Sequence, residues 1–387
     1  MPDASTTTEI PTRREYIETG GAVLGGGLLA GCLGGDDGAE PTSTDTGTDA
    51  GTTAADDSYS VTMEPVGTVE FDDVPETWSP YTADYADMGV ALGHGDGLAA
   101  IGLAARYATH LYDELPGVSV DADDLVELWS DGTNTEVYYQ VDADLHVVDP
   151  NFMVNRLGWS RDDVEEIATN VGPFLGNTGF TRVYDWHDYR YYSMYEAFEK
   201  LAAVFDERAR YEAFAAYHDE VLADVQSRLP DERPDVAVLY PADVPPDSFY
   251  PYLVGDGTSF KHFRDLGVGD ALAEAGVQDA QAGGGTVDYE TLLDADPDAI
   301  AIRMQGEITD QYVQDEIVSY MADDEAGSRL SAVQNDRVFY GGVTYQGPII
   351  HLFQLERAAR GLYPEEFGAD EQLFDRQRVA DIVAGEH

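Results

Sequence analysis

Arginines and aromatic residues recur at the ends of the strands that the sequence predicts. After strands of the first half come Tyr81, Arg106, Tyr107, Phe152 and Met153, and after strands of the second half come Tyr250, Tyr252, Arg303, Met304 and Tyr345. Aromatic rings suit a large, flat or apolar ligand, and an arginine on each side suits carboxylate, phosphate or hydroxamate oxygens. Because ligands of open α/β sheets bind beyond the carboxyl ends of the strands, we expect a ligand cleft there. The alternative for Arg106 and Arg303 is an ordinary ion pair with a nearby surface carboxylate.

The histidines do not predict a metal site formed by the protein alone. All eight are spread singly along the chain, and no two have the spacing of metal ligands. His146 alternates within a predicted strand, which favours a core position. A haem ligand among His187, His262 or a cleft tyrosine stays open, and we expect no resident metal or cofactor.

Sequence signals for catalysis are weak. The glycine-rich segments at residues 93–97 and 255–259 lack a following Gly-Lys-Ser/Thr element, and no Gly-x-Ser-x-Gly element occurs. The single cysteine, Cys32, leaves no partner for a disulfide. We therefore expect a protein that is not an enzyme. A cell-surface enzyme or an adhesive protein is the alternative from another class.

The chain is strongly acidic. Its 387 residues include 75 Asp and Glu against 21 Lys and Arg, a formal net charge of −54, and only Lys200 and Lys261 are lysines. A field of this sign repels phosphate backbones, so a nucleic-acid-binding role is excluded. With 43% hydrophobic residues the chain still buries a large core. The pattern indicates the protein of an extreme halophile, adapted to molar salt where the Debye length is about 3 Å.

The first 32 residues resemble an export signal. Arg13-Arg14 precedes an apolar run at residues 20–31, shorter than the roughly 17 residues needed to cross a bilayer. The paired arginines resemble a twin-arginine signal, and the sequence ending at Cys32, Leu-Ala-Gly-Cys, resembles a lipobox. Residues 33–60, rich in Thr, Asp and Gly, predict a disordered acidic linker. We expect a protein at the outer face of the cytoplasmic membrane, anchored by lipid on Cys32.

Alternating apolar runs and helical patterns predict two α/β lobes built on parallel sheets. The longest helical pattern, residues 206–229 with Asp206 as its N-cap, separates an N-terminal lobe at 65–205 from a C-terminal lobe at 233–387. We expect this helix to be a rigid strut of roughly 35 Å. Predicted strands cover residues 98–103, 145–148, 170–175, 236–239, 299–302 and 338–340, and the other predicted helices cover 84–92, 136–141, 162–169, 262–275, 288–293 and 349–360.

Four segments in order resemble the substrate-binding proteins of ABC importers for iron-siderophores, haem and cobalamin. They lie at residues 69–76, 142–150, 289–300 and 346–359. The most specific is 289–300, where a helix leads through Pro297-Asp298 into a buried strand. The resemblance covers residues 65–368 and implies the class III fold, two parallel-sheet α/β lobes joined by one long rigid helix. It also implies delivery of a ferric siderophore or related metal chelate, with haem or cobalamin as the alternative.

In this family an acidic residue on each lobe docks onto arginines of the permease. Glu136 stands where the glutamate of the N-terminal lobe is expected, and Asp265 and Asp270 are the candidates in the C-terminal lobe. The implied partners are an ABC permease dimer with its ATPase, a small-molecule chelate, and the membrane through the lipid anchor. We expect a monomer.

Replacing Cys32 by serine tests the anchor. Two acyl chains give stable membrane attachment where one does not, and Cys32→Ser removes their attachment point. We expect the variant protein to be released into the medium or left unprocessed, as followed by fractionation and immunoblotting. A variant that stays in the membrane with unchanged mobility contradicts the lipobox interpretation.

Overall fold

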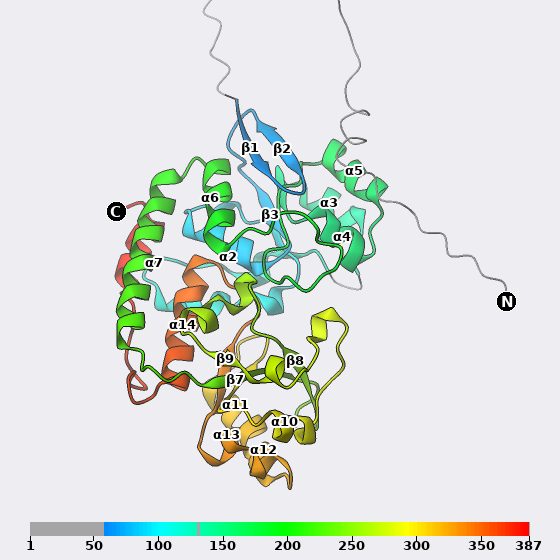
Figure 1. Ribbon diagram of the computed structural model, residues 1–387. Coiled ribbons are helices and arrows are strands. Elements are labelled where there is room, and N and C mark those ends of the chain that lie inside the picture. The colour runs from blue at the N-terminus through cyan, green and yellow to red at the C-terminus, as the bar shows by residue number, and fades with distance from the viewer. Residues whose placement is uncertain (1–57, 130–131, 387) are drawn as a thin grey trace, which may run out of the picture. The chain divides into compact units, whose positions relative to one another are not determined.

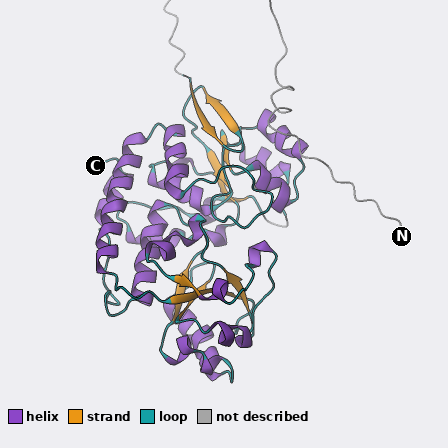
Figure 2. Cartoon of the chain, viewed as in Figure 1, coloured by secondary structure: helices purple, strands orange, loops and turns teal. Residues whose placement is uncertain are grey.

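Each half of the chain contains a group of strands flanked by helices (Figure 1 and Figure 2). The computed structural model describes residues 58–129 and 132–386. The predicted export signal, Cys32 and residues 33–57 of the predicted linker lie outside the described residues. Among the helices that the structure describes, none combines the length and the apolar character needed to cross a membrane.

A β-hairpin opens the described chain. β1 (Tyr59–Met63) pairs antiparallel with β2 (Gly67–Phe71), and alternate residues of both strands are buried. β1 lies against α6 (Met194–Val204). Residues 59 and 60 therefore belong to the folded part, so the linker ends earlier than the predicted residue 60.

The N-terminal lobe contains a parallel sheet of very short strands. β3 (Trp78–Pro80) pairs with β6 (Leu145–Val147), and β4 (Ala100–Ile101) pairs with β5 (Val126–Glu127). Single parallel bridges, Trp78 to Leu98 and His146 to Phe174, extend this ladder. The strands predicted at 98–103 and 170–175 are thus reduced to two residues and one bridge. The remaining helices of this lobe are α2 (Ala83–Ala91), α3 (Thr135–Val141), α4 (Pro150–Leu157) and α5 (Arg161–Asn170).

The C-terminal lobe is built on a five-stranded sheet. The strand order is β11 (Val338–Gly342), β10 (Ala299–Arg303), β7 (Asp235–Pro241) and β8 (Phe249–Tyr252), and β9 (Gly269–Asp270) also pairs with β7. Only β8 runs antiparallel to β7, whereas β9, β10 and β11 belong to parallel pairs. Val238 and Ala301 face the core shared with the N-terminal lobe, and Leu239 and Ile302 face a second core. The helices here are α8 (Lys261–Asp265), α9 (Ala271–Glu274), α10 (Tyr289–Ala295), α11 (Asp310–Val313), α12 (Ser319–Asp323), α13 (Ser331–Gln334) and α14 (Pro348–Leu362), with a π-helical turn at Gln314–Val318.

The prediction of one helix over residues 262–275 is wrong. α8 ends before Gly267, whose φ of +71° is the left-handed conformation that terminates helices. The chain then adds β9 to the sheet before α9 begins.

The longest helix, α7 (Arg208–Arg228), leads from the N-terminal lobe to β7. Its 21 residues give a length of roughly 30 Å, and Figure 1 shows it alongside α14. The helix predicted at 206–229 is present, but Asp206 does not cap it. Asp206 has a φ of +54° in the turn after α6, and Glu207 precedes the helix without a side-chain cap. Buried side chains recur three or four residues apart along α7: Phe214, Tyr217, His218, Val221 and Val225.

A buried carboxylate joins the two lobes at a second place. Asp87 on α2 is 0% exposed and accepts hydrogen bonds from the backbone N–H groups of Ile349 and Ile350, at 2.9 and 3.0 Å. The Tyr112 hydroxyl donates to its other oxygen at 2.7 Å. Because the N-cap of α14 is Gly347, which has no side chain, Asp87 supplies the missing cap from the other lobe. Burial raises the pKa of Asp87 to about 7, against the effect of these donors.

The C-terminal helix α15 (Arg376–Val383) packs against α7 and α2 rather than against the C-terminal sheet. Arg376 also forms ion pairs with Glu114 and Glu356, which lie in different lobes. Residues 376–383, predicted as part of the C-terminal lobe, therefore tie both lobes together.

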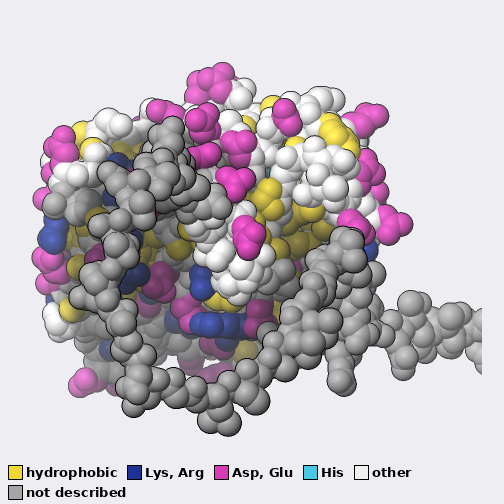
Figure 3. Space-filling model, turned by 90° about the horizontal axis from the view of Figure 1, so that it is seen from above, with side chains coloured by type: hydrophobic (Ala, Val, Ile, Leu, Met, Phe, Trp, Pro, Cys, Tyr) yellow, Lys and Arg dark blue, Asp and Glu magenta, His cyan; other side chains and the backbone are white. Residues whose placement is uncertain are grey.

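The described surface is as acidic as the composition predicts. Asp and Glu side chains are spread over the face shown in Figure 3, and Lys and Arg side chains are few there. This distribution belongs to a folded surface and not to a separate acidic segment.

The Asp87 junction predicts a large effect of one substitution. Asp87→Ala should lower the free energy of unfolding by roughly 3 to 5 kcal/mol, because three buried donors lose their acceptor. Asp288→Ala is the matched control, since Asp288 is an exposed carboxylate that caps α10 by accepting the N–H of Thr291 at 2.9 Å; its loss should cost about 1 kcal/mol. Urea unfolding in molar KCl measures both, and equal small losses would contradict the junction.

Candidate functional site

Aromatic residues from both lobes meet at the strand ends. Tyr81 follows β3, Phe152 lies on α4 after β6, and Tyr345 follows β11. Ring centres lie 5.8 Å apart for Tyr81 and Phe152, 5.7 Å for Phe152 and Phe180, and 5.2 Å for Phe180 and Tyr345. The structure therefore brings the predicted Tyr81, Phe152 and Tyr345 together, through Phe180, which the sequence analysis missed.

Arg106 lies among tyrosine hydroxyls from both lobes. Its guanidinium lies beside Tyr345, and its charge also acts on Tyr81 and Tyr252. Burial raises the pKa of all three tyrosines, and the charge of Arg106 only opposes that rise. The three hydroxyls are protonated at neutral pH, so this site offers hydrogen-bond donors and a cation.

Tyr184 completes the group. Its ring centre lies 6.4 Å from that of Phe152 and 6.3 Å from that of Phe180. Burial raises its pKa to about 12, and the Arg156 guanidinium lies 4.9 Å from its ring centre. We call Arg106, Tyr81, Tyr184, Tyr252 and Tyr345 the tyrosine–arginine cluster. Sequence reasoning missed Tyr184 because it lies in a long loop, although the aromatic residues crowded after residues 170–175 were a signal.

No carboxylate pairs with Arg106 in the part of the chain that the structure describes: no Asp or Glu oxygen of residues 58–129 or 132–386 lies within 4.0 Å of its side-chain nitrogens. Its Nε is buried without a hydrogen-bond partner. Other arginines are paired, such as Arg228 with Glu371 at 2.6 Å. The surface ion pair that was the alternative for Arg106 therefore does not form, and a cation stays available to a ligand.

Two buried carboxylates lie near the cluster without pairing with Arg106. Asp84 acts on Tyr345, and burial raises the pKa of Asp84 to about 6. Asp279 acts on Tyr184 and accepts backbone N–H groups of Leu253 and Gln281, at 2.8 and 2.7 Å. These local bonds engage both oxygens of Asp279, and neither carboxylate lies within 4.0 Å of the Arg106 nitrogens.

The position of Arg303 differs from the one predicted, in which its side chain faces the ligand. Its side chain is 1% exposed, and Nη2 donates to the carbonyl oxygens of Val343 and Thr344, at 2.6 and 2.8 Å. Burial lowers the pKa of Arg303 to about 10, so it stays cationic at neutral pH. As for Arg106, no ion pair with a carboxylate forms among the described residues. The structure places Arg303 inside the C-terminal lobe, behind the cluster.

Tyr107 lies apart from the tyrosine–arginine cluster, in the core beside Tyr112. It is buried, and its hydroxyl lies 2.9 Å from the Tyr112 hydroxyl, which bonds Asp87. Arg106 ends a 3₁₀ turn (Ala104–Arg106), and Tyr107, which follows that turn in extended conformation, is directed into the core.

Neither histidine considered for haem lies among the clustered tyrosines. His262 is fully buried with its Nδ1 2.9 Å from the Gln346 amide, and burial lowers its pKa well below the usual value. His187 is separated from Tyr184 by the ring of Trp186. Residues 58–129 and 132–386 also contain no group of three or more His, Cys, Asp or Glu side chains able to hold a metal ion.

The predicted docking acids have different environments. Glu136 is exposed in the first turn of α3. Asp265 instead pairs with Lys261 at 2.7 Å and His351 at 2.9 Å; burial would raise its pKa, but these partners hold it well below its usual range. Asp270 caps α9 and accepts two backbone N–H groups. Both aspartates are therefore engaged inside the C-terminal lobe.

The two lobes repeat one structural element. Asn134 caps α3 and Asp288 caps α10, each by accepting the backbone N–H three residues later. Two residues after each cap stands an exposed glutamate, Glu136 in one lobe and Glu290 in the other. Both helices start at the carboxyl edge of their sheets, because a crossover helix runs antiparallel to the strand that follows it.

The equivalence continues beyond the two helices. α3 ends at Asp142 with a φ of +49°, and α10 ends at Asp296 with a φ of +43°. Two residues later, Asp144 and Asp298 each accept a backbone N–H at the start of a neighbouring strand, at 2.9 Å in both lobes. Glu290 is therefore the counterpart of Glu136.

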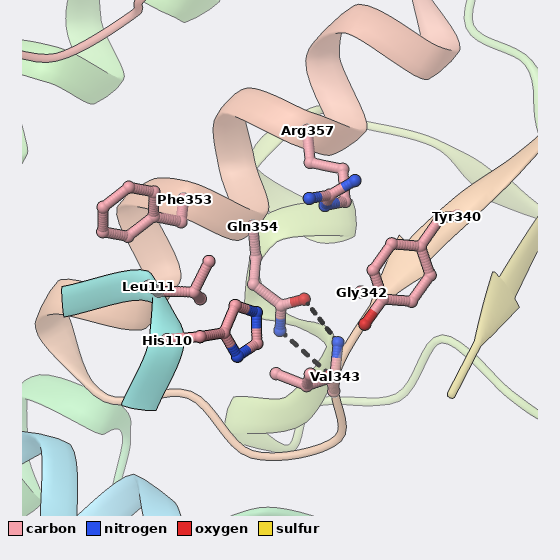
Figure 4. A pocket seen from close by; sticks show the side chains of 8 residues that line it. All are labelled: His110, Leu111, Tyr340, Gly342, Val343, Phe353, Gln354 and Arg357. Carbon is pink, nitrogen blue, oxygen red and sulfur yellow. Dashed lines mark hydrogen bonds between the residues drawn. The ribbon is translucent and has the colours of Figure 1, made fainter. Parts of the chain in front are cut away.

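A groove of about 420 Å³ lies elsewhere, along β11. Its arginines, Arg357 and Arg360, already pair with Asp310 and Glu356. The groove and the narrow recess beside it (Figure 4) therefore have less free positive charge for an anion than the cluster has. Residues lining the groove include Leu111, Glu114, Val313, Val318, Val338, Phe339, Phe353 and Phe367.

Comparisons with known proteins agree on the family and on the fold. A family model described as periplasmic binding protein matches residues 80–343. No curated protein matches the chain.

Several solved structures share the fold. The siderophore binding protein BauB, solved with a complex of two acinetobactin molecules and ferric iron, is 16% identical, with a TM-score of 0.54 over 79% of this chain and 98% of its own. The petrobactin-binding protein YclQ from Bacillus subtilis is 14% identical, with a TM-score of 0.55 and coverage of 79% and 99%. The iron uptake ABC transporter substrate-binding protein PiuA from Streptococcus pneumoniae is 13% identical, with a TM-score of 0.54 and coverage of 78% and 98%.

Proposed function

Since the chain belongs to the periplasmic binding protein family, whose members bind solutes, we propose that it binds an anionic ferric chelate for an ABC importer. The tyrosine–arginine cluster is the proposed ligand site. It lies at the strand ends of both lobes, where a ligand would contact each of them.

The observation that supports this proposal is the state of Arg106. Although the chain has a net charge of −54, Arg106 has no carboxylate partner among the described residues, and it lies beside Tyr345 with its Nε buried and without a hydrogen-bond partner. Charge-assisted bonds from Arg106 and hydroxyl donors from the tyrosines suit the oxygens of catecholate, carboxylate or hydroxamate groups. The solved structures named for iron or siderophore binding share the fold, which supports the same ligand class.

The cellular setting is part of the proposal. Arg13-Arg14 and Cys32 favour export by the twin-arginine route and a lipid anchor at the outer face of the membrane. Export after folding suits an acidic chain of a halophile, which folds best in the salty cytosol.

Docking onto the permease is proposed through Glu136 and Glu290, in place of Asp265 and Asp270. Both glutamates are exposed in the first turns of equivalent helices. One carboxylate on each lobe could pair with arginines on each of the two subunits of a permease dimer.

Arg106→Ala tests the ligand site. Its affinity for ferric enterobactin in molar KCl should fall about 10- to 100-fold, because a hydrogen bond to a charged group is lost. Binding can be followed by fluorescence of Trp186, whose ring lies 5.0 Å from that of Tyr184. Arg161→Ala, at an exposed arginine of α5, is the control and should bind normally. Tight binding of haemin or cyanocobalamin alone, unaffected by Arg106→Ala, would overturn the anionic chelate in favour of those ligands.

Charge reversal tests docking. Glu136→Arg and Glu290→Arg should each abolish uptake of the ferric chelate while leaving its affinity unchanged, because like charges at an interface cost several kcal/mol. Glu165→Arg and Glu316→Arg change exposed acids of the same lobes outside the repeated element, and should transport normally. Normal uptake by either test variant would remove that glutamate from the interface.

A further inference from the structure

The segment between β11 and α14 is held from behind by buried side chains. Residues 343–346 connect the two elements and carry Tyr345. Arg303 donates to the carbonyl oxygens of Val343 and Thr344, at 2.6 and 2.8 Å. Gln354 on α14 accepts the N–H of Val343 at 2.9 Å and donates to its carbonyl oxygen at 3.0 Å (Figure 4).

The far end of the same segment is also fixed. Gln346 is fully buried, and its amide nitrogen lies 2.6 Å from the Thr258 carbonyl oxygen and 2.9 Å from His262 Nδ1. At the near end, Gly342 has a φ of +87°, and an added Cβ would lie 1.8 Å from Gln354 Oε1. Only glycine allows the turn and the close approach of the Gln354 amide.

In the part of the chain described, the guanidinium of Arg303 donates hydrogen bonds only to this segment and to the Ser259 carbonyl oxygen. It lies between aromatic rings, 5.0 Å from the ring centre of Phe260 and 5.9 Å from that of Tyr252. Its hydrogen bonds come from Nη2 and go to backbone carbonyl oxygens, including that of Ser259 at 3.4 Å, while its buried Nε has no partner among the described residues. Because a buried cation is costly without hydrogen bonds, the bonds from Nη2 to these carbonyl groups favour one position of the loop around it.

We propose that Arg303 and Gln354 are positioning residues of the ligand site, which hold residues 343–346 so that Tyr345 stays beside Arg106. This inference rests on the proposed function of the tyrosine–arginine cluster. Arg303 acts through Tyr345 and does not touch the ligand. Its loss should therefore change the loop first and the affinity as a consequence.

The loop can be tested without any ligand. Arg303→Lys keeps the charge but not the planar fork, and Gln354→Leu removes both bonds to Val343. In each variant, hydrogen exchange of a peptide covering residues 338–350 should quicken about tenfold relative to wild type. The matched control is Arg337→Lys, at the other end of β11, where the guanidinium bonds the Leu362 carbonyl; exchange over 343–346 should not change.

Measurements of affinity then distinguish residues that hold Tyr345 in place from residues that contact the ligand. With ferric enterobactin in molar KCl, Arg303→Lys and Gln354→Leu should each weaken binding about tenfold. In a Tyr345→Ala background the same changes should weaken it no further, because non-additivity is the sign of action through a shared residue.

Unchanged exchange in Arg303→Lys and Gln354→Leu would overturn the proposal. So would losses of affinity that add fully to that of Tyr345→Ala, since these would place Arg303 on the ligand. If Arg303→Lys does not fold, Gln354→Leu gives both readouts alone. If wild type binds no ferric chelate, the proposed function fails, and the exchange result still decides whether these residues hold the loop.

Discussion

The bond between the Asp87 carboxylate and the first N–H groups of α14 determines where the two halves of the site lie. α2, which carries Asp87, begins at Ala83, directly after the strand end that presents Tyr81. α14 begins at Pro348, directly after the segment that presents Tyr345. One buried junction therefore sets the distance between the ligand-facing residues of the two lobes. Because separating a buried carboxyl group from its donors leaves polar groups unpaired inside a core, we expect the lobes to move little relative to each other.

The site has two layers with different physical tasks. The front layer, Arg106 and the tyrosines around it, keeps polar groups available at the boundary of the lobes. The layer behind it, Arg303, Gln346 and Gln354, engages its polar groups with backbone oxygens and nitrogens. A buried polar network of this kind specifies one backbone position more than it adds stability. The position of Tyr345 in the front layer thus depends on the hydrogen bonds that Arg303 and Gln354 make to the backbone behind it.

The family, the class III fold and the long elements could be predicted from the sequence. β7, β10 and α14 are long apolar patterns, and the matched family and folds confirm the two-lobed class. The N-terminal strands are two or three residues long, too short for a periodicity to define. Near the candidate site, strand ends indicated residues that the structure brings together, Tyr81, Arg106 and Tyr345, because the carboxyl ends of parallel strands meet at one edge of a sheet.

The rest depended on side-chain direction and on tertiary contacts. Arg303 and Tyr107 also follow predicted strands, yet both point into the interior. Phe180 and Tyr184 come from a loop, and only its path along the lobe boundary makes them part of the site. The equivalence of Glu136 and Glu290 was present as a spacing, but it becomes decisive only with the matching caps and left-handed helix ends.

The acidic surface and an anionic ligand are compatible only through short-range contacts. In dilute solution a net charge of −54 would repel an anion at long range. At molar ionic strength a Debye length of about 3 Å removes that repulsion, and it removes attraction at a distance as well. Recognition must then come from a cation that touches the ligand and is not already neutralised by a neighbouring carboxylate. In the part of the chain described, Arg106 has no carboxylate partner at the boundary of the lobes, whereas Arg303 is buried and its Nη2 is bound to backbone carbonyl oxygens. Under the proposed function, an arginine without a carboxylate partner at the boundary of the lobes is therefore the residue on which binding of an anion depends.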